Sequence, residues 1–380
     1  MRVRIVGAGP AGLYLAILLK RSGLVSDLSV IEQNAPDSTF GFGVVFSDSA
    51  LEFLKEDDPQ THAAITPDLE RWSDIKIVHA GKTITVDGVG FTAVGRLHLL
   101  QLLQREAKHS GVRIEFNRSL TSLDELGKTD LIVGADGINS IVRRSNEPAF
   151  GTDIRYLTNR FAWFGTTKRF DALTQTFIKH ERGHFNAHHY RYSGSMSTFI
   201  IECDETTFLH GDLATLDEDK LRSVLDDVFT DTLEGHPLIS NRSIWRQFPV
   251  ISNRKWSDGN KVIIGDSLHT AHFSIGSGTR LALEDAIALV NALKAEPKDI
   301  QAALARYEGE RKPVLEILVN AANASASWYE TFADNMHLTP LDFAMSYLMR
   351  TKRMSPDKLR RQSPKFMMAY DRNKEDAQGG

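Results

Sequence analysis

Three glycines close to the amino terminus constrain this 380-residue chain more than any other feature. Gly7, Gly9 and Gly12 have the spacing G-x-G-x-x-G, directly after the apolar run at 3–6 and before the apolar-rich stretch at 13–19. The run fits a strand buried on both faces, and the spacing of apolar residues in the stretch fits a helix. Glycines at these positions permit a tight turn, close approach of a pyrophosphate and close packing of helix on strand. The segment therefore predicts a strand–turn–helix unit that binds a dinucleotide.

An acidic residue stands where such a unit places a carboxylate for a ribose. Glu32 ends a second short strand at 30–32, 20 residues after Gly12. A carboxylate at this distance is expected to accept a hydrogen bond from a ribose hydroxyl. The alternative is a glycine-rich turn beside an exposed glutamate, and the strand–helix–strand context argues against it.

Composition narrows the classes of function. With 45 Lys+Arg against 49 Asp+Glu the formal net charge is −4, which excludes the basic surface of a general nucleic-acid-binding protein. Cys203 is the one cysteine, so an intramolecular disulfide and a cysteine-based metal site are excluded, and we expect no metal. No uninterrupted apolar stretch reaches the length of a membrane span. We therefore expect a cytoplasmic protein without membrane attachment.

The pattern along the chain predicts a dinucleotide-binding domain interrupted by a second domain. Strand and helix patterns alternate up to about 150 and return at about 255, whereas the segments between them alternate apolar and polar residues, as antiparallel strands do. We expect an α/β protein in which a Rossmann-like domain carries an inserted antiparallel β-sheet domain and C-terminal helices. The expected bounds are 1–150 and 255–325 for the discontinuous domain, 151–254 for the substrate-binding sheet, 326–365 for a helical segment and 366–380 for a flexible tail.

Two later motifs each place an aspartate at the end of an expected strand. Asp136 ends the segment DLIVGAD (130–136), and Asp266 ends the segment KVIIGD (261–266). Ligands of open α/β sheets gather at such strand ends. Beyond Asp266, the glycines of a G-x-G at 276–278 begin a helix, whose free N–H groups favour the electron-rich edge of a reduced flavin.

These three motifs, in this order, resemble the flavoprotein aromatic hydroxylases, which are single-component FAD monooxygenases of the para-hydroxybenzoate hydroxylase type. The resemblance spans about 1–325, including Tyr307 and Arg311 in the late helix. It implies non-covalent FAD, NADH or NADPH as electron donor, and no separate reductase. It also implies a set of cofactor-binding residues: Gly7, Gly9, Pro10, Ala11, Gly12 and Glu32 for the ADP half, Arg96 for the FAD chain, Asp136 for FAD and the nicotinamide, Asp266 for the ribityl group, and Gly276, Ser277, Gly278 and Thr279 for the flavin ring.

Within this family the resemblance narrows to the salicylyl-CoA 5-hydroxylase group, through the segments at 40–54, 272–289 and 336–355. It implies that NAD(P)H and O₂ are used to hydroxylate an activated ring through a C4a-hydroperoxyflavin, converting salicylyl-CoA to 2,5-dihydroxybenzoyl-CoA (gentisyl-CoA). The same segments are similar, more loosely, to the tryptophan-derivative hydroxylase of violacein biosynthesis, so an indole substrate stays open. A flavin-binding reductase without oxygenation and a non-catalytic FAD-binding protein are the alternatives from other classes.

Candidates for the substrate side come from the flavin motif and the inserted sheet. Phe273 and Ser277 stand where most family members have a proline and a glutamine, and Phe273 is expected either to line the aromatic pocket or to pack in the core. Strand alternation in HFNAHHYRY (184–192) sends His188 and His189 to opposite faces. His188 aligns with a histidine of the related groups, which makes it the catalytic candidate for proton transfer near neutral pH. A purely structural histidine is the alternative.

Overall fold

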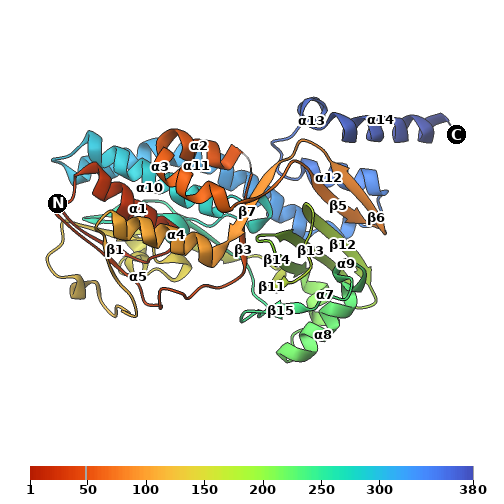
Figure 1. The fold of residues 1–380 in the computed structure, drawn as a ribbon, viewed down its shortest axis with the longest axis horizontal. Coiled ribbons are helices and arrows are strands. Elements are labelled where there is room, and N and C mark those ends of the chain that lie inside the picture. The colour runs from red at the N-terminus through yellow and green to blue at the C-terminus, as the bar shows by residue number, and fades with distance from the viewer. Residues whose placement is uncertain (48, 380) are drawn as a thin grey trace.

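The computed structural model describes residues 1–47 and 49–379, and its main layers are a six-stranded and a seven-stranded sheet (Figure 1). The six-stranded sheet has the order β17-β18-β9-β1-β2-β8, and every pair is parallel except β17 with β18. All four residues of β9 are buried, as expected of a strand covered on both faces. The strands of this sheet are β1 (Arg2–Val6), β2 (Asp27–Ile31), β8 (Arg113–Glu115), β9 (Leu131–Gly134), β17 (Ser257–Asp258) and β18 (Lys261–Ile263).

Four long helices belong to this domain: α1 (Pro10–Ser22), α4 (Arg96–His109), α10 (Gly278–Ala295) and α11 (Ile300–Glu330). Helix α1 contacts both α4 and α10, and α10 packs in turn on α11. The apolar positions that predicted α1 and α4 are buried, with Leu13 and Ile17 fully inaccessible and Leu99 and Leu103 only 1% exposed. The apolar spacing in the sequence therefore identified the packed faces correctly.

The seven-stranded sheet has the order β15-β11-β14-β13-β12-β5-β6. Its strands are β5 (Ile75–His79), β6 (Lys82–Val86), β11 (Arg160–Thr166), β12 (Leu173–His180), β13 (Gly183–Arg191), β14 (Ser197–Cys203) and β15 (Leu238–Ser240). Strands β5 and β6 come from the first 150 residues, and β12 pairs with β5 in parallel. The strands from 151–254 pair with one another in antiparallel register, as expected, but β5 and β6 from outside that range extend the sheet. Partners distant in sequence leave no mark on the local apolar pattern.

Helices cover both faces of this second sheet, and α8 (Glu218–Val228) and α12 (Pro340–Met349) lie on opposite sides of it (Figure 1). On one face, Phe185 and Phe199 pack against Phe229 just after α8. On the other, Phe177 contacts Tyr329 at the end of α11 and Phe343 of α12. Every residue of β14 is consequently buried, rather than every second one.

Smaller elements connect the two layers. Strands β3 (Gly43–Ser47), β7 (Phe91–Gly95) and β4 (Glu70–Trp72) form a three-stranded sheet, and β10 (Thr152–Tyr156) pairs with β16 (Pro249–Asn253) where the chain enters and leaves the inserted part. The remaining helices are α2 (Ser49–Asp57), α3 (Pro59–Ile65), α5 (Ile141–Arg144), α6 (Glu147–Phe150), α7 (Glu205–His210), α9 (Thr230–Leu233), α13 (Pro356–Gln362) and α14 (Pro364–Gly379).

Helix α14 occupies residues up to Gly379 of the segment 366–380, where a flexible tail is expected; residue 380 lies outside the described residues. Phe366 and Met367 are each 2% exposed, within the apolar cluster that also holds Tyr347. The backbone N–H of Phe366 donates to the Asp87 carboxylate, which ties the start of the helix to the loop after β6. The polar composition of the segment hid its two apolar anchor residues.

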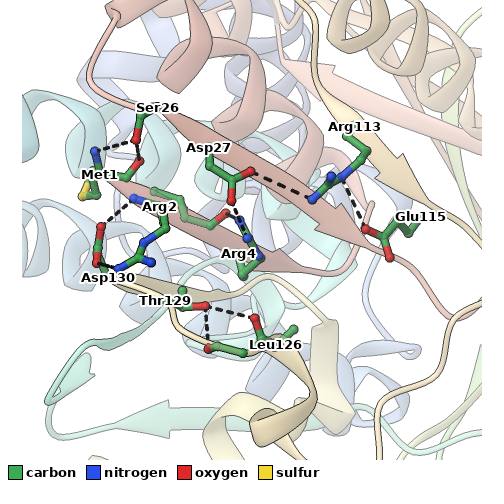
Figure 2. A network of polar contacts seen from close by, with 12 residues as sticks. Met1, Arg2, Arg4, Ser26, Asp27, Arg113, Glu115, Leu126, Thr129 and Asp130 are labelled. Atoms are coloured by element: carbon green, nitrogen blue, oxygen red, sulfur yellow. Dashed lines mark hydrogen bonds and ion pairs between the residues drawn. The ribbon is translucent and has the colours of Figure 1, made fainter.

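The amino-terminal ends of the parallel strands are held by a network of charged side chains (Figure 2). Arg2 pairs with Asp130 at 3.1 Å, ahead of β9, and Arg4 pairs with Asp27 at the start of β2. Arg113 of β8 lies between Asp27 and Glu115. This network joins four strands at one end of the sheet, so their opposite, carboxyl-terminal ends are where the predicted ligand residues gather. Within the described ranges, no helix is long and apolar enough to cross a membrane.

Candidate active site

The residues expected to bind the cofactor meet at one edge of the six-stranded sheet. In the parallel ladder β1 lies between β2 and β9, and β9 lies beside β18, with their carboxyl ends aligned. Gly7, Glu32, Asp136 and Asp266 each follow within three residues of one of these strand ends. The structure therefore brings together four residues that span 260 positions of sequence, where open α/β sheets bind ligands.

The turn after β1 can be built only with glycine at two of its three glycine positions. Gly7 has a φ of +101°, and a Cβ there would lie 2.3 Å from the carbonyl oxygen of Ala135. A Cβ on Gly12 would lie 2.0 Å from the carbonyl oxygen of Gly7. At Gly9, by contrast, a Cβ would meet nothing within 4 Å, so this glycine leaves open space beside the turn. These are the three roles that the motif predicts: turn, close packing and access for a ligand.

The amino terminus of α1 has the features of an anion-binding site. Gly9 is the N-cap and makes no side-chain capping bond, Pro10 begins the helix, and the first turn carries no acidic residue. The first-turn N–H groups, including that of Ala11, have no partner within the helix, and the helix dipole adds positive potential. This arrangement fits the pyrophosphate of FAD.

Glu32 lies within bonding distance of this turn. Its Oε2 accepts from the Ala8 N–H at 2.8 Å, and its Oε1 accepts from the backbone and side-chain nitrogens of Asn34, each at 2.8 Å. These bonds fix the half-buried carboxylate beside the glycine loop. Oε2, which accepts a single hydrogen bond, retains a lone pair with which to accept from a ribose hydroxyl.

Arg96 begins α4 and carries an unsatisfied donor. Its Nε is buried and has no hydrogen-bond partner among the described residues. Burial lowers the pKa of its guanidinium, and the nearby Asp266 carboxylate opposes that effect. A buried N–H without an acceptor is costly, so an acceptor group on a bound cofactor would satisfy it. Arg96 thus fits its expected position beside the FAD chain.

The two aspartates of the later motifs differ in their surroundings. Asp136 is half-buried, and its carboxylate accepts from Ser140 Oγ at 2.6 Å, Ser267 Oγ at 3.1 Å and the Ile141 N–H at 2.6 Å. Asp266 is exposed, in a short 3₁₀ turn at Gly265–Ser267. Desolvation by the surrounding protein raises the pKa of the Asp266 carboxyl, while the nearby His269 and Arg96 oppose that rise. Asp136 therefore ties two turns together, and Asp266 is the more accessible of the two aspartates.

A buried ion network supports the turn of Asp266, and sequence reasoning missed its centre, Asp285. This carboxylate accepts from the Gly265 N–H at 3.1 Å, from His269 Nε2 at 2.7 Å and from Arg311 Nε at 2.9 Å. Burial alone would raise the pKa of Asp285, but His269 and Arg311 hold it below its ordinary value. The signal in the sequence was the adjacent Glu284 and Asp285 within the mainly apolar helical stretch 281–293, since buried charges require partners.

The segment before α10 leads from the flavin motif to the second sheet. Gly276 has a φ of +60°, Ser277 is an N-cap whose hydroxyl donates to the Ile275 carbonyl, and Gly278 has no atom within 4 Å of an added Cβ. The first turn of α10, which includes Thr279, contains no acidic residue. Its N–H groups are therefore available to an electron-rich ring edge.

Aromatic rings gather where this segment meets the seven-stranded sheet. The Phe273 ring lies 5.0 Å from Phe161 of β11, 4.2 Å from His272 and 5.2 Å from His188 of β13, measured between ring centroids. Phe273 is half-buried and therefore keeps part of its ring accessible. His189, as predicted, faces the other side of the sheet, where it stacks on Phe199.

His188 lies beside a carboxylate that sequence reasoning also missed. Its Nε2 is 3.7 Å from Oε2 of Glu202 on β14, and His272 Nε2 is 3.9 Å from Oε1 of the same carboxylate. All three side chains are at least 94% buried. Burial lowers the pKa of His188 to about 3 and that of His272 to about 4, and it raises the pKa of Glu202. Side-chain alternation along STFIIECDE (197–205) places Glu202 on the same face as Ile200, the register partner of His188. This alternation is the sequence signal that could have identified Glu202.

No group of three or more histidine, cysteine, aspartate or glutamate side chains in the described part of the chain is arranged to hold a metal ion. Cys203 is buried, and burial raises its pKa well above the ordinary value.

Comparison with known proteins shows aromatic monooxygenases that are similar over most of the chain. Salicyloyl-CoA 5-hydroxylase from Streptomyces sp is 40% identical over 361 residues, which cover 92% of this chain and 70% of that enzyme. The 3-hydroxy-4-methyl-anthranilyl-(aryl-carrier protein) 5-monooxygenase from Streptosporangium sibiricum is 36% identical, covering 88% and 90%. Protodeoxyviolaceinate monooxygenase from Chromobacterium violaceum is 33% identical, covering 94% and 96%.

Solved structures share the fold at lower identity. Tetrameric 2-methyl-3-hydroxypyridine-5-carboxylic acid oxygenase has a TM-score of 0.69 at 19% identity, covering 92% of this chain and 95% of that one. Tetracycline destructase Tet(51) has a TM-score of 0.63 at 18% identity, covering 97% and 96%. The family described as FAD binding domain matches residues 1–322. The expected fold class and the resemblance to flavoprotein aromatic hydroxylases are confirmed, and the chain belongs to the FAD binding domain family as a FAD-dependent aromatic monooxygenase.

Proposed function

We propose that this monooxygenase hydroxylates an aryl-CoA thioester, converting 2-hydroxybenzoyl-CoA (salicyloyl-CoA) to 2,5-dihydroxybenzoyl-CoA. The observation that carries the proposal is the 40% identity to salicyloyl-CoA 5-hydroxylase along 92% of the chain. A second relative is named for an aryl group on a carrier protein, and both names specify position 5 of the ring. A carrier-bound aryl group, attacked at position 5, is the chemistry that these two names share.

The residues at the strand ends would hold FAD. When it is bound and reduced by NADH or NADPH, FAD activates O₂ for transfer of one oxygen atom. The glycine turn and the start of α1 would bind its pyrophosphate, and Glu32 its ribose. Arg96 and Asp266 would contact the chain between the pyrophosphate and the ring. The first turn of α10 would face the flavin ring through its N–H groups.

The aromatic group around Phe273 supports a substrate ring next to that flavin position. Phe161 and Phe248 lie 5.0 Å and 6.1 Å from the Phe273 ring, so an aromatic substrate would find stacking and edge contacts here. The same rings exclude water, which protects the activated oxygen from unproductive loss. In 2-hydroxybenzoyl-CoA the ring hydroxyl is para to carbon 5, so its electrons direct attack to that carbon.

An indole-type substrate is the second candidate. It is favoured by the 33% identity to protodeoxyviolaceinate monooxygenase, which covers 94% of this chain and 96% of that enzyme. An indole derivative needs no phosphate contacts, whereas CoA requires Lys or Arg beside its phosphates. The affinity for the thioester should therefore weaken with added salt, and the affinity for a neutral indole should not.

The deciding experiment supplies the FAD-loaded enzyme with O₂ and either NADH or NADPH, and follows product mass and coupling. The candidate substrates are 2-hydroxybenzoyl-CoA, 2-aminobenzoyl-CoA, 2-hydroxybenzoate and a tryptophan derivative. We expect one added oxygen on a thioester, with most reducing equivalents used for it. Hydroxylation of the free acid or the indole alone would refute the thioester proposal. Cofactor oxidation without any oxygenated product would indicate a reductase.

A further inference from the structure

We propose that Glu202 and His188 form a proton-accepting pair for the ring hydroxyl of the substrate, with Glu202 as the base. The inference rests on the proposed function, because it concerns the hydroxyl of the proposed substrate. It extends that function by assigning a catalytic role to Glu202, which only the tertiary structure brings next to His188.

The two facing atoms are the strongest evidence. Glu202 Oε2 and His188 Nε2 lie 3.7 Å apart, and neither has a hydrogen-bond partner among the described residues. The side chains are 2% and 6% exposed, so both atoms are buried without satisfaction. Leaving such atoms unpaired is unfavourable, and one hydroxyl placed beside both atoms would satisfy them.

The position of the pair fits a substrate ring. The His188 ring contacts Phe273 edge-on, and Phe273 precedes the turn that begins α10. Phe161 of β11 lies directly opposite Glu202 of β14 in the strand register, so both side chains lie on the same face of the sheet. A ring packed against these phenylalanines would present its hydroxyl to the pair while its other side faced the start of α10.

The rest of the surroundings keeps Glu202 in place and leaves one oxygen free. Its Oε1 accepts from Asn159 Nδ2 at 2.8 Å, and Asn159 is anchored in turn through its backbone N–H to Glu330 at 2.7 Å. The other titratable or charged groups near the pair are His272, Tyr329, Glu330 and Arg350. Arg350 donates hydrogen bonds to Ser325 Oγ and to the backbone carbonyls of Tyr347 and Ser274. Among the described residues, no lysine or arginine forms an ion pair with Glu202, and burial raises the pKa of its carboxyl, which makes it a stronger base.

The proposed step conserves charge and protons. The O–H bond of the ring hydroxyl breaks, its proton forms a bond to Glu202 Oε2, and the electron pair stays on the ring oxygen. The negative charge thus moves from the carboxylate to the ring, where it increases electron density at carbon 5. After oxygen transfer, carbon 5 releases its own proton to solvent and Glu202 returns the stored proton to the ring oxygen.

The test measures the ionisation of bound 2-hydroxybenzoyl-CoA on the oxidised, FAD-loaded enzyme, without an electron donor, from its absorption between about pH 5 and 9. The variants are Glu202→Gln, His188→Gln and, as a control, Glu181→Gln at an exposed glutamate in the turn between β12 and β13. The thioester of 2-methoxybenzoate has no ionisable hydroxyl and reports binding alone, through the flavin spectrum. Retained FAD and an unchanged thermal transition show that each variant is folded.

We expect the wild-type enzyme to raise the ionisation pH of the bound phenol by at least one unit, because the ionised Glu202 carboxylate accepts the hydrogen bond of the hydroxyl and opposes a second negative charge beside it. Glu202→Gln should abolish that shift while the affinity for the methoxy thioester changes less than about twofold, and Glu181→Gln should preserve it. An unshifted phenol on the wild-type enzyme, or the same shift in Glu202→Gln, overturns the proposal. If 2-hydroxybenzoyl-CoA does not bind but 2-hydroxybenzoate does, the thioester function fails, and the same comparison with 2-hydroxybenzoate decides the role of Glu202. If neither phenol binds, both proposals are overturned.

Discussion

Arg311 of α11 donates from Nε to Oδ1 of Asp285 on α10 across 2.9 Å, and both side chains are buried. The other oxygen of Asp285 holds the Gly265 N–H, so this ion pair supports the turn that carries Asp266. Arg311→Leu removes one partner and should destabilise the fold by about 3–5 kcal/mol. Urea unfolding of the apoprotein measures the change. Arg306→Leu, which breaks the more exposed pair of Arg306 with Glu310, should cost less than about 1 kcal/mol, and equal costs for the two variants would contradict the assignment.

The glycine turn allows binding and folding to be separated by two similar substitutions. A methyl group at Gly9 meets open space and a compatible φ of −71°, so Gly9→Ala should leave the stability of the apoprotein nearly unchanged. The methyl group would nevertheless intrude where the pyrophosphate approaches, so FAD affinity should fall sharply. Gly12→Ala should instead destabilise the apoprotein, because its Cβ would lie 2.0 Å from the Gly7 carbonyl oxygen. Thermal unfolding and FAD titration distinguish the two effects.

Glu32→Gln tests the ribose contact. The loss of a charged acceptor should weaken FAD binding by about 1.5–3 kcal/mol, which corresponds to roughly a 10- to 100-fold rise in Kd. Gln33→Ala alters the exposed neighbour and should have no effect. Equal FAD affinity in Glu32→Gln and the wild type would show that the carboxylate serves only the turn, through Ala8 and Asn34.

Asp136 and Asp266 should respond differently to alanine. Asp136→Ala deletes bonds to Ser140, Ser267 and Ile141 and should lower the stability of the apoprotein by about 2 kcal/mol or more. Asp266→Ala should leave that stability nearly intact and reduce FAD occupancy. The reverse pattern in unfolding and FAD-binding measurements would refute this division of roles.

The two buried histidines should make the protein sensitive to acid. The pKa values of about 3 for His188 and about 4 for His272 lie below the value of about 6.5 expected for the unfolded chain. Between these limits the unfolded state binds more protons, so the free energy of unfolding falls as the pH drops below about 6.5, by up to about 1.4 kcal/mol per pH unit for each histidine. Glu202 acts with the opposite sign, because its raised pKa lets the folded state hold a proton that the unfolded state releases.

Removing one of these histidines tests the acid sensitivity. His188→Gln should reduce the slope of unfolding free energy against pH between about 5 and 6.5. His109→Gln, at a side chain that is 76% exposed, should leave the slope unchanged. Equal slopes for wild type and His188→Gln would mean that His188 does not titrate as its burial requires.

Much of this site could be predicted from the sequence, because its features follow from interactions between residues close together in the chain. Glycine spacing, strand ends and the position of Glu32 depend on a few neighbouring residues, and the structure places Gly7, Glu32, Asp136 and Asp266 at one sheet edge as expected. Alternation along β13 likewise predicted that His188 and His189 face opposite sides. In each case backbone geometry fixes the direction of a side chain within its own segment.

The sequence by itself determined the parallel sheet, the dinucleotide turn and the family, because those features reside in short contiguous motifs. Only the tertiary structure decided that β5 joins β12, that Asp285 holds the turn of Asp266, and that Glu202 faces His188. It also decided that Asp136 accepts three hydrogen bonds within the protein while Asp266 is exposed. These relations depend on register and packing between segments distant in the chain, and the free energy of a buried charge depends on which partners that packing brings within a few ångströms.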